Sequence, residues 1–134
     1  MKTARILSLT LALFIGALAI SARVAPTSTP KEGAIRVLFL GHESEHHNSN
    51  KFYPMVAKAL GRDAIYFDYV TNVEEAFGDP EYLSKFDAVL LYANHGKITP
   101  EQWKNLKGYV ENGGGFVPVH CASWCFGNEP GFDK

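Results

Sequence analysis

The sequence predicts an α/β domain built on a parallel sheet. Short apolar runs alternate with segments whose apolar residues recur at helical spacing. One of these runs, Ala88–Tyr92, is continuously apolar, which is typical of a strand buried on both faces. Strands that alternate with helices form right-handed βαβ units, so we expect a doubly wound parallel sheet.

The first half of the domain is predicted to contain two strands and one helix. Ile35–Leu40 ends at Gly41 and predicts the first strand, and Ile65–Val70, rich in aromatic and β-branched residues, predicts the second. Pro54 fits the intervening helix only if it lies in the first turn. The helix ends at Gly61, and its apolar positions are Phe52, Met55, Val56, Ala59 and Leu60.

The second half is predicted to contain two strands and a well-marked helix. Residues 72–85 predict short helical turns, and Ala88–Tyr92 and Phe116–Val119 predict the third and fourth strands. Between these strands, Thr99 is an N-cap and Pro100 occupies the first helical position. Gln102 completes a capping box, and the apolar stripe is Trp103, Leu106 and Val110.

The N-terminus has the pattern of a secretory signal peptide. A basic segment with Lys2 and Arg5 precedes the apolar stretch Ile6–Ile20, which is shorter than the roughly 20 residues that span a bilayer. Ala17-Leu18-Ala19 supplies a small-residue cleavage pattern, and Ala22 offers a second one. We therefore expect a periplasmic or secreted protein.

This cleavage divides the chain into three parts. We expect a signal peptide at residues 1–22, a flexible leader at 23–33 and one small domain at 34–134. The chain has 13 Lys and Arg against 14 Asp and Glu, and the loss of Lys2 and Arg5 makes the mature protein more acidic. We therefore expect no nucleic-acid partner, and no stable membrane span after signal removal.

All five histidines follow a predicted strand or lie in the loop beyond it. His42, His46 and His47 follow the first strand, His95 the third and His120 the fourth. Because ligands bind beyond the carboxyl ends of parallel strands, we expect these residues to converge at one edge. The structural alternatives are solvated loop residues for His42 and His46, a turn residue for His95, and a core histidine that caps a carbonyl for His120.

Two chemistries suit this set. Neutral imidazoles from several loops are ligands for Zn²⁺, which in catalytic sites takes three protein ligands and leaves one position open. Alternatively, His120 and His47, with Glu43 or Glu45 nearby, act as general acid and base on a polar substrate. The sequence contains no H-E-x-x-H motif and no Gly-rich phosphate loop.

The two cysteines are expected to be free thiols. Cys121 and Cys125 are separated by three residues, and this spacing on a helical turn disfavours a disulfide. The strand-to-helix turn resembles a nucleophile elbow, but alignment with that pattern places His120 at the nucleophile position. Catalysis by Cys121 is therefore disfavoured.

Several segments together resemble the trehalose-utilisation (ThuA-like) family. The resemblance runs from about Ile35 to the last residue, and the Gly113–Val117 segment with His120 is its most specific part. The other matching segments are Val37–Leu40, His47–Ser49, Phe86–Asn94, Ile98–Gln102 and Ser123.

The resemblance implies a three-layer, flavodoxin-like parallel sheet similar to that of class I glutamine amidotransferases. The amidotransferase cysteine corresponds to His120, so that activity is not implied. In a flavodoxin-like order we expect the first and fourth strands to be neighbours, so that His47 and His120 face one pocket. Because the family's later strands and helices are missing, we expect the fold to be C-terminally incomplete.

The family's link to carbohydrate utilisation implies a domain that acts on a sugar or sugar derivative. We expect His120 and His47 to be catalytic, with His42, His46 and Asn94 binding substrate, since imidazole and amide groups both donate and accept hydrogen bonds. The alternatives are a non-catalytic carbohydrate-binding or interaction module, and an inactive fragment of a longer multidomain protein.

The fourth strand is expected to be central, yet few residues follow it. After Phe126 we find no segment that predicts a covering helix or a neighbouring strand. The far edge of this strand would present unpaired N–H and C=O groups, so we expect oligomers to form through it.

The export prediction is tested by N-terminal sequencing of the protein from its native host. We expect the mature chain to begin near Ile20 or Arg23, because signal peptidase cleaves after small residues. An intact Met1 on a cytoplasmic product would contradict the prediction.

Overall fold

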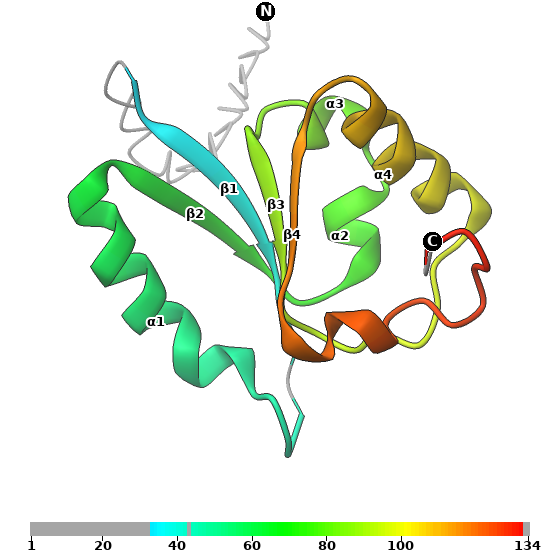
Figure 1. Cartoon of the computed structure of the whole chain (residues 1–134), viewed down its shortest axis with the longest axis horizontal. Helices are drawn as coiled ribbons and strands as arrows, with labels where there is room; N and C mark the ends of the chain where they lie inside the picture. The colour runs from blue at the N-terminus through cyan, green and yellow to red at the C-terminus, as the bar shows by residue number, and fades with distance from the viewer. Residues whose placement is uncertain (1–32, 43, 133–134) are drawn as a thin grey trace, which may run out of the picture.

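In the computed structural model, four parallel strands form one sheet with helices on both of its faces (Figure 1). The structure describes residues 33–42 and 44–132. The signal peptide and nearly all of the leader predicted for residues 1–33 lie outside this part, as does Glu43. The strands are β1 (Ile35–Leu40), β2 (Ile65–Val70), β3 (Ala88–Leu91) and β4 (Gly115–Pro118).

The strand order is β2-β1-β3-β4, and every neighbouring pair is parallel. This confirms the predicted flavodoxin-like α/β fold. The expectation that the first and fourth strands are neighbours is wrong, because β3 lies between β1 and β4. The expectation that no strand pairs with the far edge of the fourth strand is confirmed for the described part of the chain, where β4 is an edge strand.

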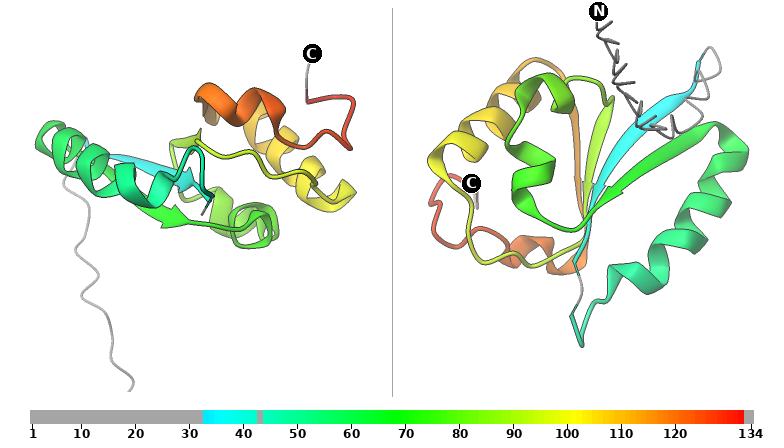
Figure 2. Two further views of the ribbon diagram at one scale, coloured as in Figure 1. Left: turned by 90° about the horizontal axis from the view of Figure 1, so that it is seen from below. Right: turned by 180° about the vertical axis from the view of Figure 1, so that it is seen from behind.

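The helices lie on opposite faces of the sheet (Figure 2). Helix α1 (Ser49–Leu60), followed by the 3₁₀ turn η1 (Gly61–Asp63), covers one face. The other face carries α2 (Val73–Phe77), α3 (Pro80–Leu83) and α4 (Pro100–Glu111), and the 3₁₀ turn η2 (His120–Trp124) follows β4. In none of the described helices is there an apolar stretch long enough to cross a membrane.

Helix α1 is rotated relative to the stripe predicted from its sequence. The side chains of Phe52 and Met55 are 42% and 62% exposed, whereas Tyr53 packs edge-on against Phe39 of β1. Apolar residues occur on both sides of this helix, so helical spacing alone could not select the buried side. Pro54 lies in the second turn rather than the first, since the helix begins at Ser49.

Helix α4 begins as its capping residues predict. Thr99 accepts a hydrogen bond from the Gln102 N–H, and the Gln102 side chain accepts one from the Thr99 N–H. The predicted stripe is wrong at Val110, which is exposed. Tyr109 faces the protein instead and donates a hydrogen bond from its hydroxyl to the Phe86 carbonyl.

The main core lies between the sheet and helices α2 to α4. Alternate residues of the central strands are fully buried on this face, including Leu38, Leu40, Val89 and Leu91. They pack with Phe77 of α2 and Leu106 of α4. These buried strands hold the carboxyl ends of the sheet in place, where the functional residues follow.

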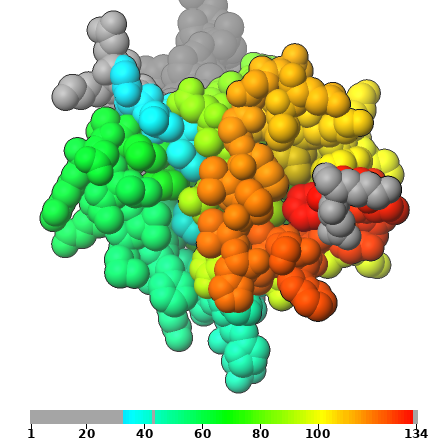
Figure 3. Space-filling model, viewed as in Figure 1, coloured from blue at the N-terminus to red at the C-terminus, as the bar shows by residue number. Residues whose placement is uncertain are grey.

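The two faces of β4 differ. The segment after η2 folds back over one face, where Phe132 packs edge-on against Phe116 and Phe126. On the opposite face Val117 is exposed, and Val119 follows it at the surface. Figure 3 shows β4 and η2 together on the surface of the molecule. Among the described residues, no further strand pairs with the outer edge of β4.

Candidate functional site

The histidine-bearing loops meet at the carboxyl ends of the strands. Because all four strands are parallel, the segments that follow β1, β3 and β4 emerge at the same end of the sheet (Figure 1). His42 and His47 come from the first segment, Asn94 and His95 from the second, and His120 begins η2. This is the edge at which ligands bind in open parallel sheets.

His47 and His120 are brought into ring contact. Their ring centroids are 4.5 Å apart, with an angle of 53° between the ring planes. Since β1 and β4 are not neighbours, the loop after β1 has to reach past the end of β3 to make this contact. The His47 ring lies 6.5 Å from the ring of Tyr92, the residue that follows β3, which places it on that route.

Both histidines have left-handed backbone conformations, with φ angles of 60° at His47 and 53° at His120. Residues other than glycine rarely adopt such angles, and they concentrate at binding and catalytic sites. At His120 the chain turns sharply from strand into helix, as in a nucleophile elbow. The hydrogen bond from the Val119 N–H to the Leu91 carbonyl fixes the chain just before this turn.

A cavity of about 250 Å³ opens between these residues. Its lining residues are His47, Asn94, His120, Cys121 and Trp124. Trp124 is 82% exposed, an unusual degree of exposure for an indole. Among the described residues, no carboxylate lines the cavity.

His42 and His46 are not brought to this cavity. His42 is buried, and its Nδ1 accepts a hydrogen bond from the Asn94 N–H at 3.3 Å. Burial, reinforced by the nearby charge of His95, lowers the pKa of His42. His46 is exposed. Of the two predicted acidic partners, Glu43 and Glu45, the structure describes Glu45, which is also exposed.

His42 and His95 instead connect the loops that carry the site. The His95 Nε2 lies 2.9 Å from the Gly41 carbonyl, and the two imidazole rings are 5.7 Å apart. The His95 carbonyl accepts a hydrogen bond from the Phe126 N–H. These contacts tie the segments after β1, β3 and η2 to one another.

Ser49, at the start of α1, holds the loop after β1 closed through hydrogen bonds to His42. Its fully buried hydroxyl accepts a hydrogen bond from the His42 N–H at 2.7 Å and donates one to the His42 carbonyl at 2.9 Å. The two bonds close the segment that carries His47 into a loop. The position of His47 therefore depends on a side chain outside the cavity.

Both cysteines are free thiols, as predicted, and both are buried. Burial raises the pKa of Cys121, and it raises the pKa of Cys125 to about 11. Cys125 donates a hydrogen bond to the Ala93 carbonyl, whereas Cys121 lines the cavity. The sequence pattern alone did not link Cys121 to the two histidines, and it did not single out Trp124.

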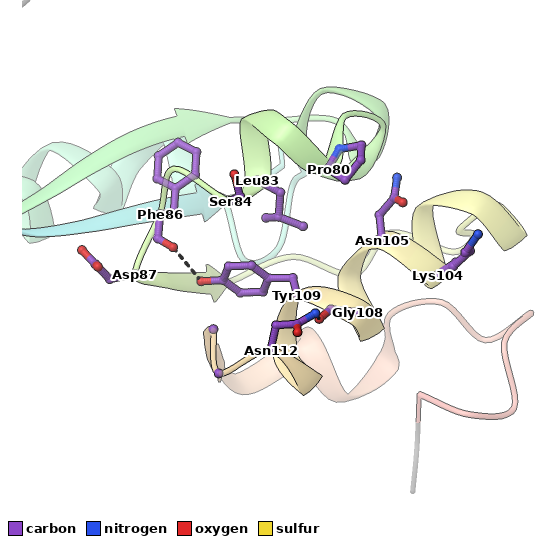
Figure 4. Close-up of a pocket in the computed structure, with 12 residues that line it drawn as sticks. Pro80, Leu83, Ser84, Phe86, Asp87, Lys104, Asn105, Gly108, Tyr109 and Asn112 are labelled. Carbon is purple, nitrogen blue, oxygen red and sulfur yellow. Dashed lines mark hydrogen bonds between the residues drawn. The ribbon is translucent and has the colours of Figure 1, made fainter.

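A second, larger cavity of about 620 Å³ lies at the opposite end of the sheet (Figure 4). It is bordered by Asp87, just before β3, and by Gly114, just before β4. Two of its polar side chains serve the fold, since Tyr109 donates to the Phe86 carbonyl and Asn105 to the Phe77 carbonyl. The smaller cavity, at the ligand-binding end of the strands, is the better candidate.

A family model described as trehalose utilisation (ThuA) matches residues 36–133. Among solved structures, a ThuA-like protein from Parabacteroides merdae ATCC 43184 has a TM-score of 0.61 and 24% identity, covering 74% of this chain and 37% of that one. A ThuA-like protein from Bacteroides uniformis ATCC 8492 has a TM-score of 0.57 and 21% identity, covering 73% and 41%. The chain thus spans about two-fifths of the length of these proteins. No curated protein matches it.

Replacing Ser49 with alanine tests the attachment of the loop. The Ser49→Ala change leaves the buried His42 N–H without its acceptor, and we expect it to lower the free energy of unfolding by about 1–3 kcal/mol. Urea unfolding measures this, with Ser84→Ala as the control because the exposed Ser84 hydroxyl bonds only within its own helical turn. Equal, small losses in both variants would contradict the assigned role.

Proposed function

This chain belongs to the trehalose-utilisation (ThuA) family, and we propose that it is an enzyme acting on a sugar or sugar derivative through His120 and His47. The observation that carries the proposal is the pairing of these two imidazoles in one cavity, each on a left-handed backbone. Two strained residues from separate loops meet at the edge where parallel sheets bind ligands.

The cavity lining suits a polyhydroxylated ligand. The Asn94 amide and the two imidazoles both donate and accept hydrogen bonds, which matches the hydroxyl groups of a sugar. The exposed indole of Trp124 offers a flat apolar surface beside them, against which the C–H face of a pyranose can pack. His42 supports this arrangement indirectly, through its hydrogen bond with the Asn94 backbone.

The same lining also favours a second candidate function, a carbohydrate-binding module without catalysis. An exposed tryptophan supports sugar binding alone, and no carboxylate of the described residues borders the cavity to assist proton transfer. The two functions differ in what happens to a bound sugar, so they are separated by measuring binding and turnover on the same protein.

The decisive experiment replaces His120 in the full-length protein and follows both properties with trehalose and related disaccharides. We expect His120→Ala to lower turnover by roughly 10²–10⁴-fold, the range for loss of a positioned proton-transfer group. The melting temperature should change little, since His120 is exposed. His46→Ala, an exposed histidine outside the cavity, is the matched control.

The results distinguish the two candidates. Sugar binding that Trp124→Ala weakens, without turnover by the parent protein, would exclude catalysis and leave the binding module. Turnover that His120→Ala leaves unchanged would overturn the assignment of this site.

We also propose that the protein is exported, since the pattern around Lys2, Arg5 and Ala17-Leu18-Ala19 supports a cleaved signal peptide. A periplasmic or secreted location suits a protein that meets sugars before uptake. The N-terminal sequencing described above tests this location independently of the catalytic proposal.

The outer edge of β4 supports a further proposal, that residues 20–134 expressed alone self-associate. Unpaired strand edges beside exposed apolar residues invite pairing with another chain, and Val117, on the open face of β4, is 48% exposed. We expect Val117→Lys to shift the chain toward monomers in size-exclusion chromatography. Val110→Lys, at an exposed position of α4, should have no such effect. A monodisperse parent monomer with a cooperative melt would contradict the proposal.

A further inference from the structure

Three side chains that bind transition metals converge in the cavity at the carboxyl ends of the strands. The ligand atoms of His47, His120 and Cys121 all lie within 4.8 Å of one another. They come from two segments, one after β1 and one after β4, which the fold brings together across the end of β3. We propose that His47, His120 and Cys121 bind one Zn²⁺ ion and leave its fourth position open to the cavity.

The donor types select the metal. A thiolate with two imidazoles is a soft ligand set that suits Zn²⁺ and similar transition metals, whereas Mg²⁺ and Ca²⁺ require oxygen ligands. Among the described residues, no carboxylate lines the cavity to supply such oxygens. A set of three protein ligands is also the usual number in zinc sites that keep a position free for water or substrate.

The geometry requires only a small adjustment. Zinc bonds of about 2.0–2.1 Å to nitrogen and 2.3 Å to sulfur place tetrahedral ligand atoms roughly 3.3–3.6 Å apart. The three ligand atoms therefore draw together by about 1 Å, a movement that side-chain rotation supplies. His120 is exposed and His47 half-buried, so both rings have room to turn, while the buried Cys121 provides the fixed point.

The backbone conformation holds the two histidines close together without a bound metal. The left-handed conformations of His47 and His120 aim the two rings at each other, at a cost of about 1–3 kcal/mol for each residue. The bonds between Ser49 and His42 close the loop that carries His47. Such prior ordering is characteristic of ligand sites, and metal binding offsets its cost.

The fourth coordination position of the ion faces Asn94 and Trp124, the two other residues that would contact a sugar. Asn94 and Trp124 border the same cavity, so a ligand resting on them comes close to the three metal-binding side chains. A bound Zn²⁺ acts there as a Lewis acid that polarises a carbonyl or acidifies a bound water or hydroxyl. This inference deepens the proposed function, but metal binding is measured without any sugar and so stands or fails separately.

The experiment uses full-length protein without a histidine tag, stripped by a chelator and titrated with Zn²⁺ and with Co²⁺. We expect about one tightly bound ion per chain, a higher melting temperature with Zn²⁺, and a sulfur-to-cobalt charge-transfer band in the Co²⁺ spectrum. The band reports the Cys121 thiolate directly, which activity cannot do.

Three variants make the test specific. Cys121→Ser should abolish the charge-transfer band. Cys125→Ser should leave the band intact, because the buried Cys125 thiol donates its hydrogen bond to the Ala93 carbonyl. His120→Ala should weaken zinc binding by more than the roughly 10–100-fold that loss of an outer-shell partner costs. Because His120 is exposed, this variant remains informative if Cys121→Ser does not fold.

The outcomes are distinct. Loss of the band in Cys121→Ser together with weakened binding in His120→Ala supports the site, even if no sugar is turned over. Binding that neither change affects, a Co²⁺ spectrum without a sulfur band, or no measurable binding overturns it. Sugar turnover by chelator-stripped protein would leave the proposed function standing without the metal.

Discussion

The parallel pairing of β3 with both β1 and β4 is the constraint on which the site depends. The register sets Leu40 opposite Leu91 and Leu91 opposite Pro118, so the three strands end at one level. Every segment that leaves a strand here therefore starts from the same edge, and residues far apart in sequence begin only one or two strand spacings from each other. An antiparallel β4 would have carried His120 to the opposite end of the sheet, beside the larger cavity that Asp87 and Gly114 border.

The loop after β1 then has to cross the end of β3 to reach His120, and hydrogen bonds to neighbouring segments maintain this crossing. Ser49 closes the loop upon His42, the Asn94 N–H holds the His42 ring, and His95 bonds the Gly41 carbonyl. The buried His42 ring thus joins two segments while remaining an acceptor at Nδ1, in keeping with its lowered pKa. Two histidines order the backbone and two others face the cavity, a division of roles that residue type alone does not reveal.

The fold was largely predictable from sequence, but the contacts between side chains within the site were not. The Ile35–Leu40 and Ile65–Val70 strands have the predicted bounds, and the Thr99 capping box forms, because turn and capping chemistry is local. The separation of β4 from β1 by β3 was missed, since strand order depends on contacts between distant segments. Local spacing likewise could not show that Phe52 faces outward. The contact of His47 with His120 depends on both strand order and the path of a loop, so only the folded chain shows it.

The turn after β4 explains why Cys121 belongs with the histidines although it is not at the elbow position. A left-handed residue reverses the chain sharply, so His120 projects outward while its neighbour Cys121 is carried beneath it into the protein. Phe126 and Phe132 follow this turn and pack edge-on against one another. The cavity is then lined by a buried thiol and by two imidazoles, of which the His120 ring is exposed. A buried sulfur beside two imidazoles suits a metal ion better than it suits cysteine nucleophilic attack, for which the thiol itself would need to be the outermost group.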